Sequence, residues 1–292
     1  MTIVETISQL HTLQARHHAE VPLRDDYRDK ANSWLDERTT DYWRHDRIRR
    51  CIAPLLVSRQ CWLTVGDGRF GADANWLIKN GQEVLCTDIQ DTTLAHAARN
   101  GTIGEYQAAN AETLPFSDGS FDWALCKESY HHMPRAPLAW YELLRVTRKG
   151  VVLIEPIDSE ANRWWGNFAL PILNALKSRG HSYEESGNYV FSLSRRDVEK
   201  MMLGVGLTVY AFRDISDCYV PGAETETSDG PLRRRLKRSI WLRDAIKRVL
   251  GVSAQLGIFV IPHEGVALPA EFNDYPWDRH QLPANPYAKR LP

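Results

Sequence analysis

Short apolar runs alternate with amphipathic stretches between residues 61 and 156. Runs rich in Val, Leu, Ile and aromatic residues predict strands at 61–65, 83–88, 105–109, 121–129 and 151–156. Apolar residues at helical spacing predict helices between them that end at Gly81, Gly101 and Gly150. This alternation is typical of a doubly wound parallel sheet. Because such sheets bind ligands beyond the carboxyl ends of their strands, functional residues are expected in the loops that begin at Gly66, Asp88, Asn110, Lys127 and Glu155.

The pattern after residue 156 is looser. Residues 194–206 predict one more regular helix, with Ser194 as its N-cap and Gly206 as its stop. Two further apolar runs, at 207–214 and 255–264, predict the last two strands. We therefore expect an α/β fold with a doubly wound, Rossmann-like sheet of seven strands. The sheet should be mostly parallel with an antiparallel last strand, and helical cap elements should cover it.

The bulk composition excludes several classes of protein. The 36 basic and 37 acidic residues nearly balance, so no global field attracts nucleic acid. None of the five cysteines forms a C-x-x-C pair, and we expect no metal site and a reduced, cytoplasmic protein. The first 20 residues lack the charged and apolar regions of a signal peptide. No apolar run approaches the roughly 18 to 20 residues that span a bilayer.

A glycine-rich turn follows the first predicted strand. Gly66, Gly68 and Gly71 form G-x-G-x-x-G between this strand and a helix, as a dinucleotide-binding fingerprint requires. Glycine lets the backbone approach a ligand closely, and free amides at the start of the helix favour a negative group. Asp88 ends the next strand about 20 residues later, where an acid binds ribose hydroxyls. This pattern alone fits NAD as well as S-adenosylmethionine (SAM), so an NAD-dependent oxidoreductase is one alternative.

The segment NAETLPFSDGSFDWALCKESYHHM, at 110–133, and the later YELLRV, at 141–146, carry a more specific signal. Together they resemble the large family of class I SAM-dependent methyltransferases that includes the quinone-biosynthesis enzymes. The matching residues are Ala111, Glu112, Leu114, Pro115, Phe116, Asp118, Ser120, Phe121, Asp122, His131, His132, Glu142, Arg145 and Val146. With the glycine turn and Asp88, the resemblance covers residues 60–156. It implies a SAM-dependent methyltransferase, and we expect it to act on an oxygen atom of a small organic acceptor.

The resemblance also implies a role for each cofactor-binding residue. Gly66 and Gly68 would approach the methionine part of SAM, Asp88 would hold the ribose, and the turn at Asn110 would meet the adenine. Lys127 would offer backbone groups near the methionine end. The full set of predicted cofactor-binding residues is Gly66, Asp67, Gly68, Asp88, Ile89, Asn110, Ala111, Glu112 and Lys127.

Two positions depart from the family pattern. Asn110 stands where Asp is frequent, but an amide oxygen can still accept a hydrogen bond from the adenine amino group. Thr64 stands where an acid is usual. This change either weakens cofactor binding or leaves the ammonium of SAM to another partner, for which Asp67 is a candidate. A catalytically silent SAM-binding protein is therefore the second alternative.

The run KESYHHM, which follows the fourth predicted strand, supplies the catalytic candidates Glu128, His131 and His132. Methyl transfer from SAM needs mainly alignment of the reacting atoms. A hydroxyl acceptor must also lose a proton, for which a base with a pKa near 7 is suited. His131 is the preferred base, with Glu128 as base or orienting group in second place. One of the two histidines could instead only cap or pack the following loop.

The long connection at 158–193 is rich in large apolar residues, and family members often carry a substrate cap at this place. Trp164, Trp165, His181 and Tyr183 are the predicted substrate-binding residues. The alternative is that the tryptophans only pack the cap onto the core. Closure of such a lid would exclude water from the reacting groups.

A strongly basic helix is predicted from Leu232 to Leu250, with eight Arg and Lys residues against the single acid Asp244. Such a helix can lie on an anionic membrane or hold a phosphorylated substrate. A solvated face paired with nearby acids is the favoured interpretation, so membrane contact is possible but not favoured. The predicted partner is a small-molecule acceptor, with no nucleic acid, and the protein is expected to be a monomer or a homodimer.

The same patterns divide the chain into five parts. We predict an N-terminal helical cap at 1–55, a SAM-binding core at 56–157, a substrate lid at 158–193, the rest of the core at 194–264 with a basic helical insertion at 230–251, and an irregular C-terminal tail at 265–292.

Overall fold

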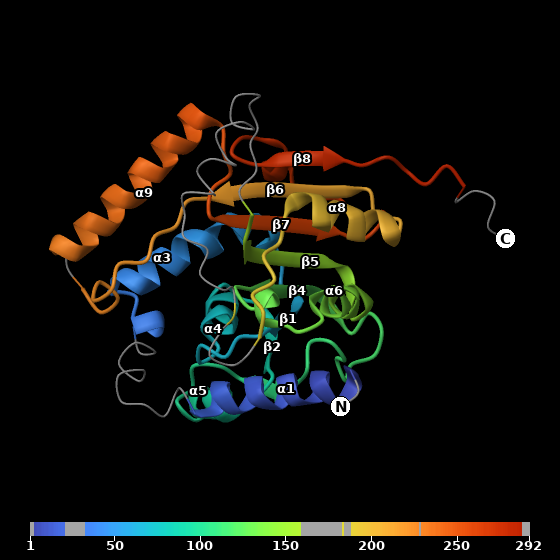
Figure 1. Ribbon diagram of the computed structural model, residues 1–292, viewed down its shortest axis with the longest axis horizontal. Coiled ribbons are helices and arrows are strands. Elements are labelled where there is room, and N and C mark those ends of the chain that lie inside the picture. Colours follow the sequence, from blue (N-terminus) through green and yellow to red (C-terminus); the bar gives the residue numbers. More distant parts are fainter. Residues whose placement is uncertain (1–2, 21–32, 159–182, 184–187, 228, 288–292) are drawn as a thin grey trace.

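The structure of the chain is a computed structural model that describes residues 3–20, 33–158, 183, 188–227 and 229–287 (Figure 1). It contains one eight-stranded sheet in the order β3-β2-β1-β4-β5-β7-β6-β8. The strands are β1 Cys61–Val65, β2 Glu83–Asp88, β3 Glu105–Ala108, β4 Phe121–Lys127, β5 Thr147–Pro156, β6 Val209–Ile215, β7 Leu256–Pro262 and β8 Asp278–Gln281. The first five strands are parallel, and β7 runs antiparallel to both of its neighbours. The expected α/β fold is confirmed.

Helices cover both faces of the sheet (Figure 1). They are α1 Ile3–Glu20, α3 Thr40–Arg49, α4 Ala72–Lys79, α5 Thr92–Arg99, α6 Ala136–Arg145, α8 Arg195–Gly204 and α9 Pro231–Leu250, with short 3-10 turns η2 Arg50–Leu56, η3 Tyr130–His132 and η4 Ala270–Asn273. Alternate residues of one strand enter different cores: Ala124 of β4 packs with α6 and α8, whereas Leu125 packs with η2 and α4. Strands buried on both faces have to be apolar throughout, which explains the continuous runs in the sequence.

The sheet differs from the expected one by its eighth strand. β8 pairs antiparallel with β6 and lies in the segment for which an irregular tail was expected. Its sequence, DRHQ, has no apolar alternation, so periodicity could not reveal it. It adds backbone hydrogen bonds to an edge that would otherwise be open.

One predicted helix end is wrong. The helix expected to stop at Gly150 stops at Arg145, and Gly150 belongs to β5. Its φ of 154° and the Ile261 carbonyl next to it leave no room for a Cβ, so glycine is required here by the sheet. The predicted cap of α8 is confirmed, because Ser194 and Asp197 form a reciprocal capping box.

The order of the strands decides where a ligand can bind. The chain leaves β1 toward β2 on one side and later returns to β4 on the other, so the topology reverses between β1 and β4. The loops after these strands diverge there and leave a crevice at the carboxyl ends. Among the helices that the structure describes, none is long and apolar enough to cross a membrane.

Candidate active site

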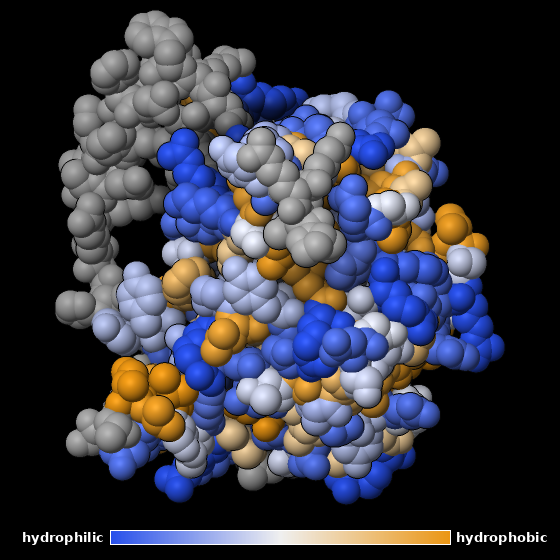
Figure 2. All heavy atoms as spheres, turned by 90° about the vertical axis from the view of Figure 1, so that its right-hand side faces the viewer, coloured by the Kyte–Doolittle hydropathy of each residue, from blue (hydrophilic) through white to orange (hydrophobic). Residues whose placement is uncertain are grey.

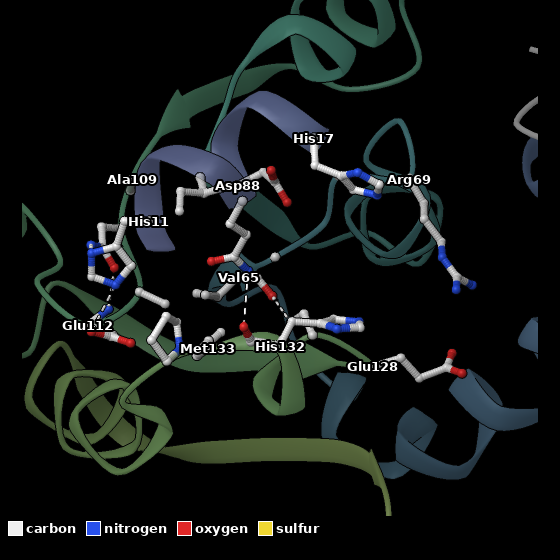
Figure 3. A pocket seen from close by; sticks show the side chains of 18 residues that line it. His11, His17, Val65, Arg69, Asp88, Ala109, Glu112, Glu128, His132 and Met133 are labelled. Atoms are coloured by element: carbon white, nitrogen blue, oxygen red, sulfur yellow. Dashed lines mark hydrogen bonds and ion pairs between the residues drawn. The ribbon is translucent and has the colours of Figure 1, made fainter. Parts of the chain in front are cut away.

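A cavity of about 240 Å³ lies at this reversal point (Figure 3). Its walls come from the loops after the first four strands and from α1. The lining residues include Val65, Gly66, Gly68, Arg69, Asp88, Ile89, Ala109, Asn110, Ala111, Glu112, Glu128, Ser129, His132 and Met133, together with His11, Gln14 and His17 of α1. Seven of the nine predicted cofactor-binding residues line this cavity; Asp67 and Lys127 do not.

The glycine turn brings the backbone against two polar side chains. Gly66 has a φ of +73°, which favours glycine, and Ser129 occupies the space that a Cβ would need. A Cβ on Gly68 would lie 2.7 Å from Oδ2 of Asp88. The glycine turn and the carboxylate of Asp88 lie close together and form one wall of the cavity, against which a nucleoside can bind.

Replacing Gly68 with alanine is expected to weaken SAM binding by about 10- to 100-fold, because the added methyl must displace Asp88 at a cost of about 1–3 kcal/mol. Isothermal titration calorimetry with SAM measures the change. Gly104→Ala is the matched control, since nothing lies within 4 Å of a Cβ at Gly104. Unaltered SAM affinity in the Gly68 variant would contradict this role.

Asp88 is a buried carboxylate that accepts hydrogen bonds from the backbone of Gly68, Ile89 and Gln90. The amide of Gln90 donates to its Oδ1 over 3.2 Å. Burial raises the pKa of Asp88 to about 6, and the backbone hydrogen bonds from Gln90 and Gly68 only partly oppose this effect. Two hydroxyl donors, such as those of a ribose, would satisfy this group.

The loop after β3 is fixed by its own side chains. Oδ1 of Asn110 accepts from the amide of Glu112 over 2.9 Å. The buried carboxylate of Glu112 accepts from the backbone amide and Nε of Arg135 at 2.6 and 2.7 Å, and it contacts Nε2 of His11 at 3.1 Å. Glu112 therefore holds α1 and the segment after η3 at the cavity, with its carboxylate already engaged by protein donors.

Asp67 points away from the cavity. Its carboxylate accepts from the backbone amides of Asp73 and Ala74, in the first turn of α4, at 3.2 and 2.8 Å. Burial and the neighbouring Asp73 raise its pKa to about 7. The structure thus places Asp67 as a cap of α4 and Thr64 as a buried residue of β1, and neither lines the cavity.

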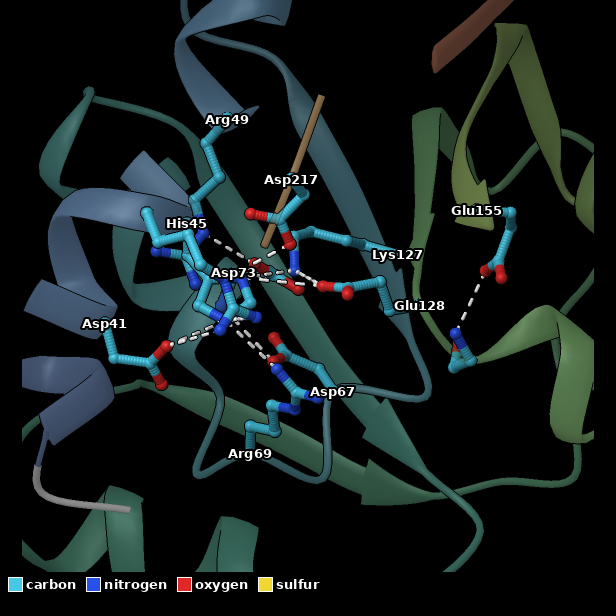
Figure 4. Close-up of polar contacts among 12 residues, drawn as sticks. Asp41, His45, Arg49, Asp67, Arg69, Asp73, Lys127, Glu128, Glu155 and Asp217 are labelled. Carbon is cyan, nitrogen blue, oxygen red and sulfur yellow. Dashed lines mark hydrogen bonds and ion pairs between the residues drawn. The ribbon is translucent and has the colours of Figure 1, made fainter. Parts of the chain in front are cut away.

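A charged cluster borders the cavity beyond Gly66 (Figure 4). Nζ of Lys127 donates to Glu128 over 2.5 Å and lies 2.9 Å from Nδ1 of His45, while Nη1 of Arg69 lies 3.1 Å from Nε2 of His45. Burial alone would raise the pKa of Glu128, but Lys127 and Arg69 outweigh it and hold this pKa well below its usual range. Glu128 is consequently an ionised carboxylate that is too weakly basic to remove a proton from a hydroxyl.

His131 is paired with Glu155, which lies near the end of β5 and is completely buried. The carboxylate of Glu155 accepts from Nδ1 of His131 over 2.6 Å and from the amides of Ser129 and Tyr130 over 2.9 Å each. An ionised carboxylate only accepts hydrogen bonds, so Nδ1 of His131 is the donor in this pair.

The two neighbouring histidines have different places. His132 lines the cavity, whereas His131 does not, and their ring centroids are 3.9 Å apart. Figure 3 shows His132 and Glu128 on one side of the cavity and His11 and His17 of α1 around it. The carbonyl of His132 accepts from Gln14 of α1. The structure thus brings all three catalytic candidates to one loop, beside the cofactor cavity.

The predicted acceptor site falls mostly outside the described residues. Trp164, Trp165 and His181 lie there. Tyr183 is described, is exposed, and packs its ring edge-on against Tyr189 with centroids 5.5 Å apart. Within the described ranges, no group of three or more His, Cys, Asp or Glu residues could hold a metal ion.

Several residues of the site escaped the sequence analysis. Glu155 was expected only as the start of a loop; it lies near the end of β5, where ligands bind, but its pairing with His131 was not predicted. His45 and Arg69 reach the charged cluster from α3 and from the glycine turn, and His11 and His17 reach the cavity from α1. Nothing in the pattern of these segments distinguishes them from surface helix residues, since only the tertiary fold brings them to the site.

Comparison with known proteins gives a family for the central part of the chain. Residues 63–154 match the family described as "Methyltransferase domain". An uncharacterized protein of Mycobacterium tuberculosis is 38% identical over 117 residues, which are 36% of this chain and 42% of that protein. The demethylmenaquinone methyltransferase of Beutenbergia cavernae is 28% identical over 131 residues, 42% of this chain and 53% of the enzyme. The chain thus spans about half the length of these relatives.

Solved structures resemble the fold more distantly. A SAM-dependent methyltransferase from Archaeoglobus fulgidus has 13% sequence identity and a TM-score of 0.49, over 75% of this chain and 92% of that one. The family match and the site agree on the class. Residues 63–154 form a methyltransferase domain of the SAM-dependent class, which confirms the resemblance and SAM as the cofactor of this domain.

Proposed function

We propose that the whole protein is a cytoplasmic methyltransferase that transfers the methyl group of SAM to an oxygen atom of a small organic acceptor. The observation that carries this proposal is the His131–Glu155 pair, because His131 belongs to the loop after β4 whose neighbouring residues line the cavity. Cavity and pair together provide a cofactor site and a base for a hydroxyl. All five cysteines are free, which supports a reducing compartment.

The residues around the cavity fit SAM. Asp88 can accept from both ribose hydroxyls, and the turn at Asn110 offers an amide to an adenine. Glu128 lines the cavity next to Gly66 and remains ionised, so it can hold the ammonium that the usual acid at position 64 would otherwise bind. When bound, SAM supplies an electrophilic methyl group on a sulfonium.

The proposed base acts through Nε2 of His131. This nitrogen accepts the proton of the acceptor hydroxyl, while Glu155 keeps the ring in its tautomer and stabilises the imidazolium that forms. Glu155 is a positioning residue, since it acts through His131. The acceptor approaches from the side of the segment that follows β5. Trp164, Trp165, His181 and Tyr183 are the proposed residues of its binding site, and 158–193 is the proposed lid.

Two alternatives have less support. An NAD-dependent oxidoreductase would not explain the family match over 63–154. A silent SAM-binding protein would have no need of a buried carboxylate that orients a histidine. The division of the chain into five parts and a monomeric or homodimeric state remain predictions.

Calorimetric titration with SAM, S-adenosylhomocysteine and NAD tests the cofactor. We expect binding of the first two ligands and none of NAD. A screen of phenols, sugars and lipid-linked glycans, read by release of S-adenosylhomocysteine, then tests the activity. Binding of NAD in place of SAM would overturn the assignment, and SAM binding without product from any acceptor would favour the silent protein.

A further inference from the structure

The basic helix α9 is inserted in the sequence between β6 and β7. It lies beyond the end of the sheet at which β6 finishes (Figure 1). Only two of its residues, Leu236 and Ile240, are buried. They pack against Cys218, Val220 and Ala223, with Trp43 of α3 beside them. One side of α9 therefore attaches the helix to the body, and the other side faces outward.

The outward side of α9 carries both apolar and cationic groups. Trp241, Leu242 and Val249 are 68%, 53% and 64% exposed. A helical step of about 100° per residue places Leu242 and Val249, with Arg235 and Arg238, on the side opposite Ile240, and Trp241 about 100° away from Ile240. Transfer of such apolar side chains from water to an apolar environment is favourable. This surface is therefore better suited to contact with a partner than to full exposure to solvent.

The cations of α9 differ in their partners. Lys237 and Lys247 are neutralised by Asp229 and Asp214. Arg234, Arg235 and Arg238 are exposed, and none of them forms an ion pair with a carboxylate of the described residues. The expectation of a solvated face paired with nearby acids therefore fits the two lysines and, more weakly, Arg234, whose charge helps to lower the pKa of Asp229.

The surface on the far side of the molecule is different. The face seen in Figure 2, near α8 and β8, is mostly hydrophilic, and its hydrophobic residues occur in small groups. On α9 exposed arginines occur in both halves, at Arg234, Arg235 and Arg238 and again at Arg243 and Arg248, and the exposed apolar residues Trp241, Leu242, Ile246 and Val249 lie in the second half. This is the distribution of an interfacial helix, whose basic residues meet lipid phosphates while Trp and Leu enter the headgroup region.

We propose that the outward side of α9, formed by Arg234, Arg235, Arg238, Trp241, Leu242, Ile246 and Val249, docks on an anionic lipid bilayer. The charge complementarity between these exposed arginines and lipid phosphates identifies the partner. Nucleic acid would use the arginines but leave Trp241 and Val249 in water. α9 lies beyond the carboxyl ends of the parallel strands, which is also where the cofactor cavity lies (Figure 1). Docking of α9 therefore turns these strand ends and the cavity toward the membrane.

Sedimentation of the full chain with vesicles tests the proposal. We expect binding to vesicles of phosphatidylcholine mixed with phosphatidylglycerol, little binding to phosphatidylcholine alone, and release by high salt. Equal binding to both vesicles, or none to either at low salt, would overturn the proposal. Tighter binding to a DNA duplex than to anionic vesicles at the same salt would also overturn it.

Two triple variants with the same change in net charge locate the surface. R234Q/R235Q/R238Q should lower the vesicle partition coefficient by about 100-fold, since each basic residue near an anionic surface contributes about fivefold. R99Q/K200Q/R279Q removes three exposed cations on α5, α8 and β8 and should change the coefficient by less than about twofold. Equal losses in both variants would show that only net charge matters, and α9 would not be the docking surface.

The apolar half of α9 is tested separately. W241S/L242S should bind anionic vesicles more weakly than the unaltered chain, and the fold-difference should be the same at every salt concentration at which the unaltered chain still binds, because it does not depend on charge. SAM affinity of each variant, measured by calorimetry, confirms that the fold is intact. An unchanged partition coefficient for W241S/L242S would show that no apolar insertion takes place and would contradict the proposed interface.

Discussion

Replacing Glu155 with glutamine is expected to lower kcat by about 10³- to 10⁴-fold, while SAM affinity changes little. The glutamine oxygen can still accept from the amides of Ser129 and Tyr130, so the loop should remain in place. Its NH₂ group, however, would face Nδ1 of His131 and favour the wrong tautomer, in which Nε2 carries the proton and cannot act as a base. Release of S-adenosylhomocysteine with the identified acceptor measures the loss.

Comparison of three variants shows whether Glu155 acts through His131. If the two residues work as a unit, E155Q, H131A and the double variant should lose similar factors in kcat. His263→Gln is the control, because His263 is a half-buried histidine that contacts Thr147 at the start of β5, away from the cavity. Additive losses in the double variant would indicate separate roles, and full activity of H131A would remove His131 from the mechanism.

Replacing Asp88 with asparagine should have opposite effects on binding and on stability. Loss of the charged acceptor for two hydroxyls should weaken SAM binding by about 100-fold or more. The pKa of Asp88 is about 6 in the folded protein against 3.8 in the unfolded chain. As the pH rises from about 4 to 6, the unfolded chain releases this proton before the folded protein does. Ionisation of Asp88 therefore lowers the free energy of unfolding at pH 7 by about 3 kcal/mol. An asparagine does not ionise and avoids this cost.

Denaturation in urea at pH 7 and pH 4 tests whether D88N raises or lowers the free energy of unfolding. D88N should be more stable than the unaltered chain at pH 7, and the difference should shrink at pH 4, where the carboxyl group is protonated in the folded state. Asp122→Asn is a control of opposite sign, since its backbone and ionic partners hold the pKa of Asp122 below its usual value. A D88N variant that is less stable at pH 7, or that binds SAM normally, would contradict the assignment.

The local parts of the site were predictable from the sequence. The turn at Gly66 and Gly68, the acid at Asp88 and the loop with His131 each lie directly after a strand, so strand ends alone place them on one edge. Asp67 could not be assigned in this way, because its neighbours in the sequence place it near the cofactor while its side chain caps α4. The direction in which a side chain points from a turn depends on the backbone φ and ψ angles, and the pattern of apolar and polar residues does not predict these angles.

Long-range contacts were not predictable. Glu155 joins His131 only because β5 lies beside β4, and this order follows from packing of the whole sheet. His45 meets Lys127 across 82 positions of the sequence. β8 was missed for a related reason, since its polar residues gain their strand conformation from pairing with β6 and not from their own preference.

This last strand also has a consequence for how copies of the protein behave toward one another. β6 is a largely apolar strand, VYAFRDI, whose outer backbone groups would form an open template without β8. β8 occupies these groups and presents charged residues, Asp278 and Arg279, at the outermost position. A chain that ended before residue 278 would therefore expose the unpaired backbone of β6 to other copies. Such a chain should self-associate before it loses catalytic activity.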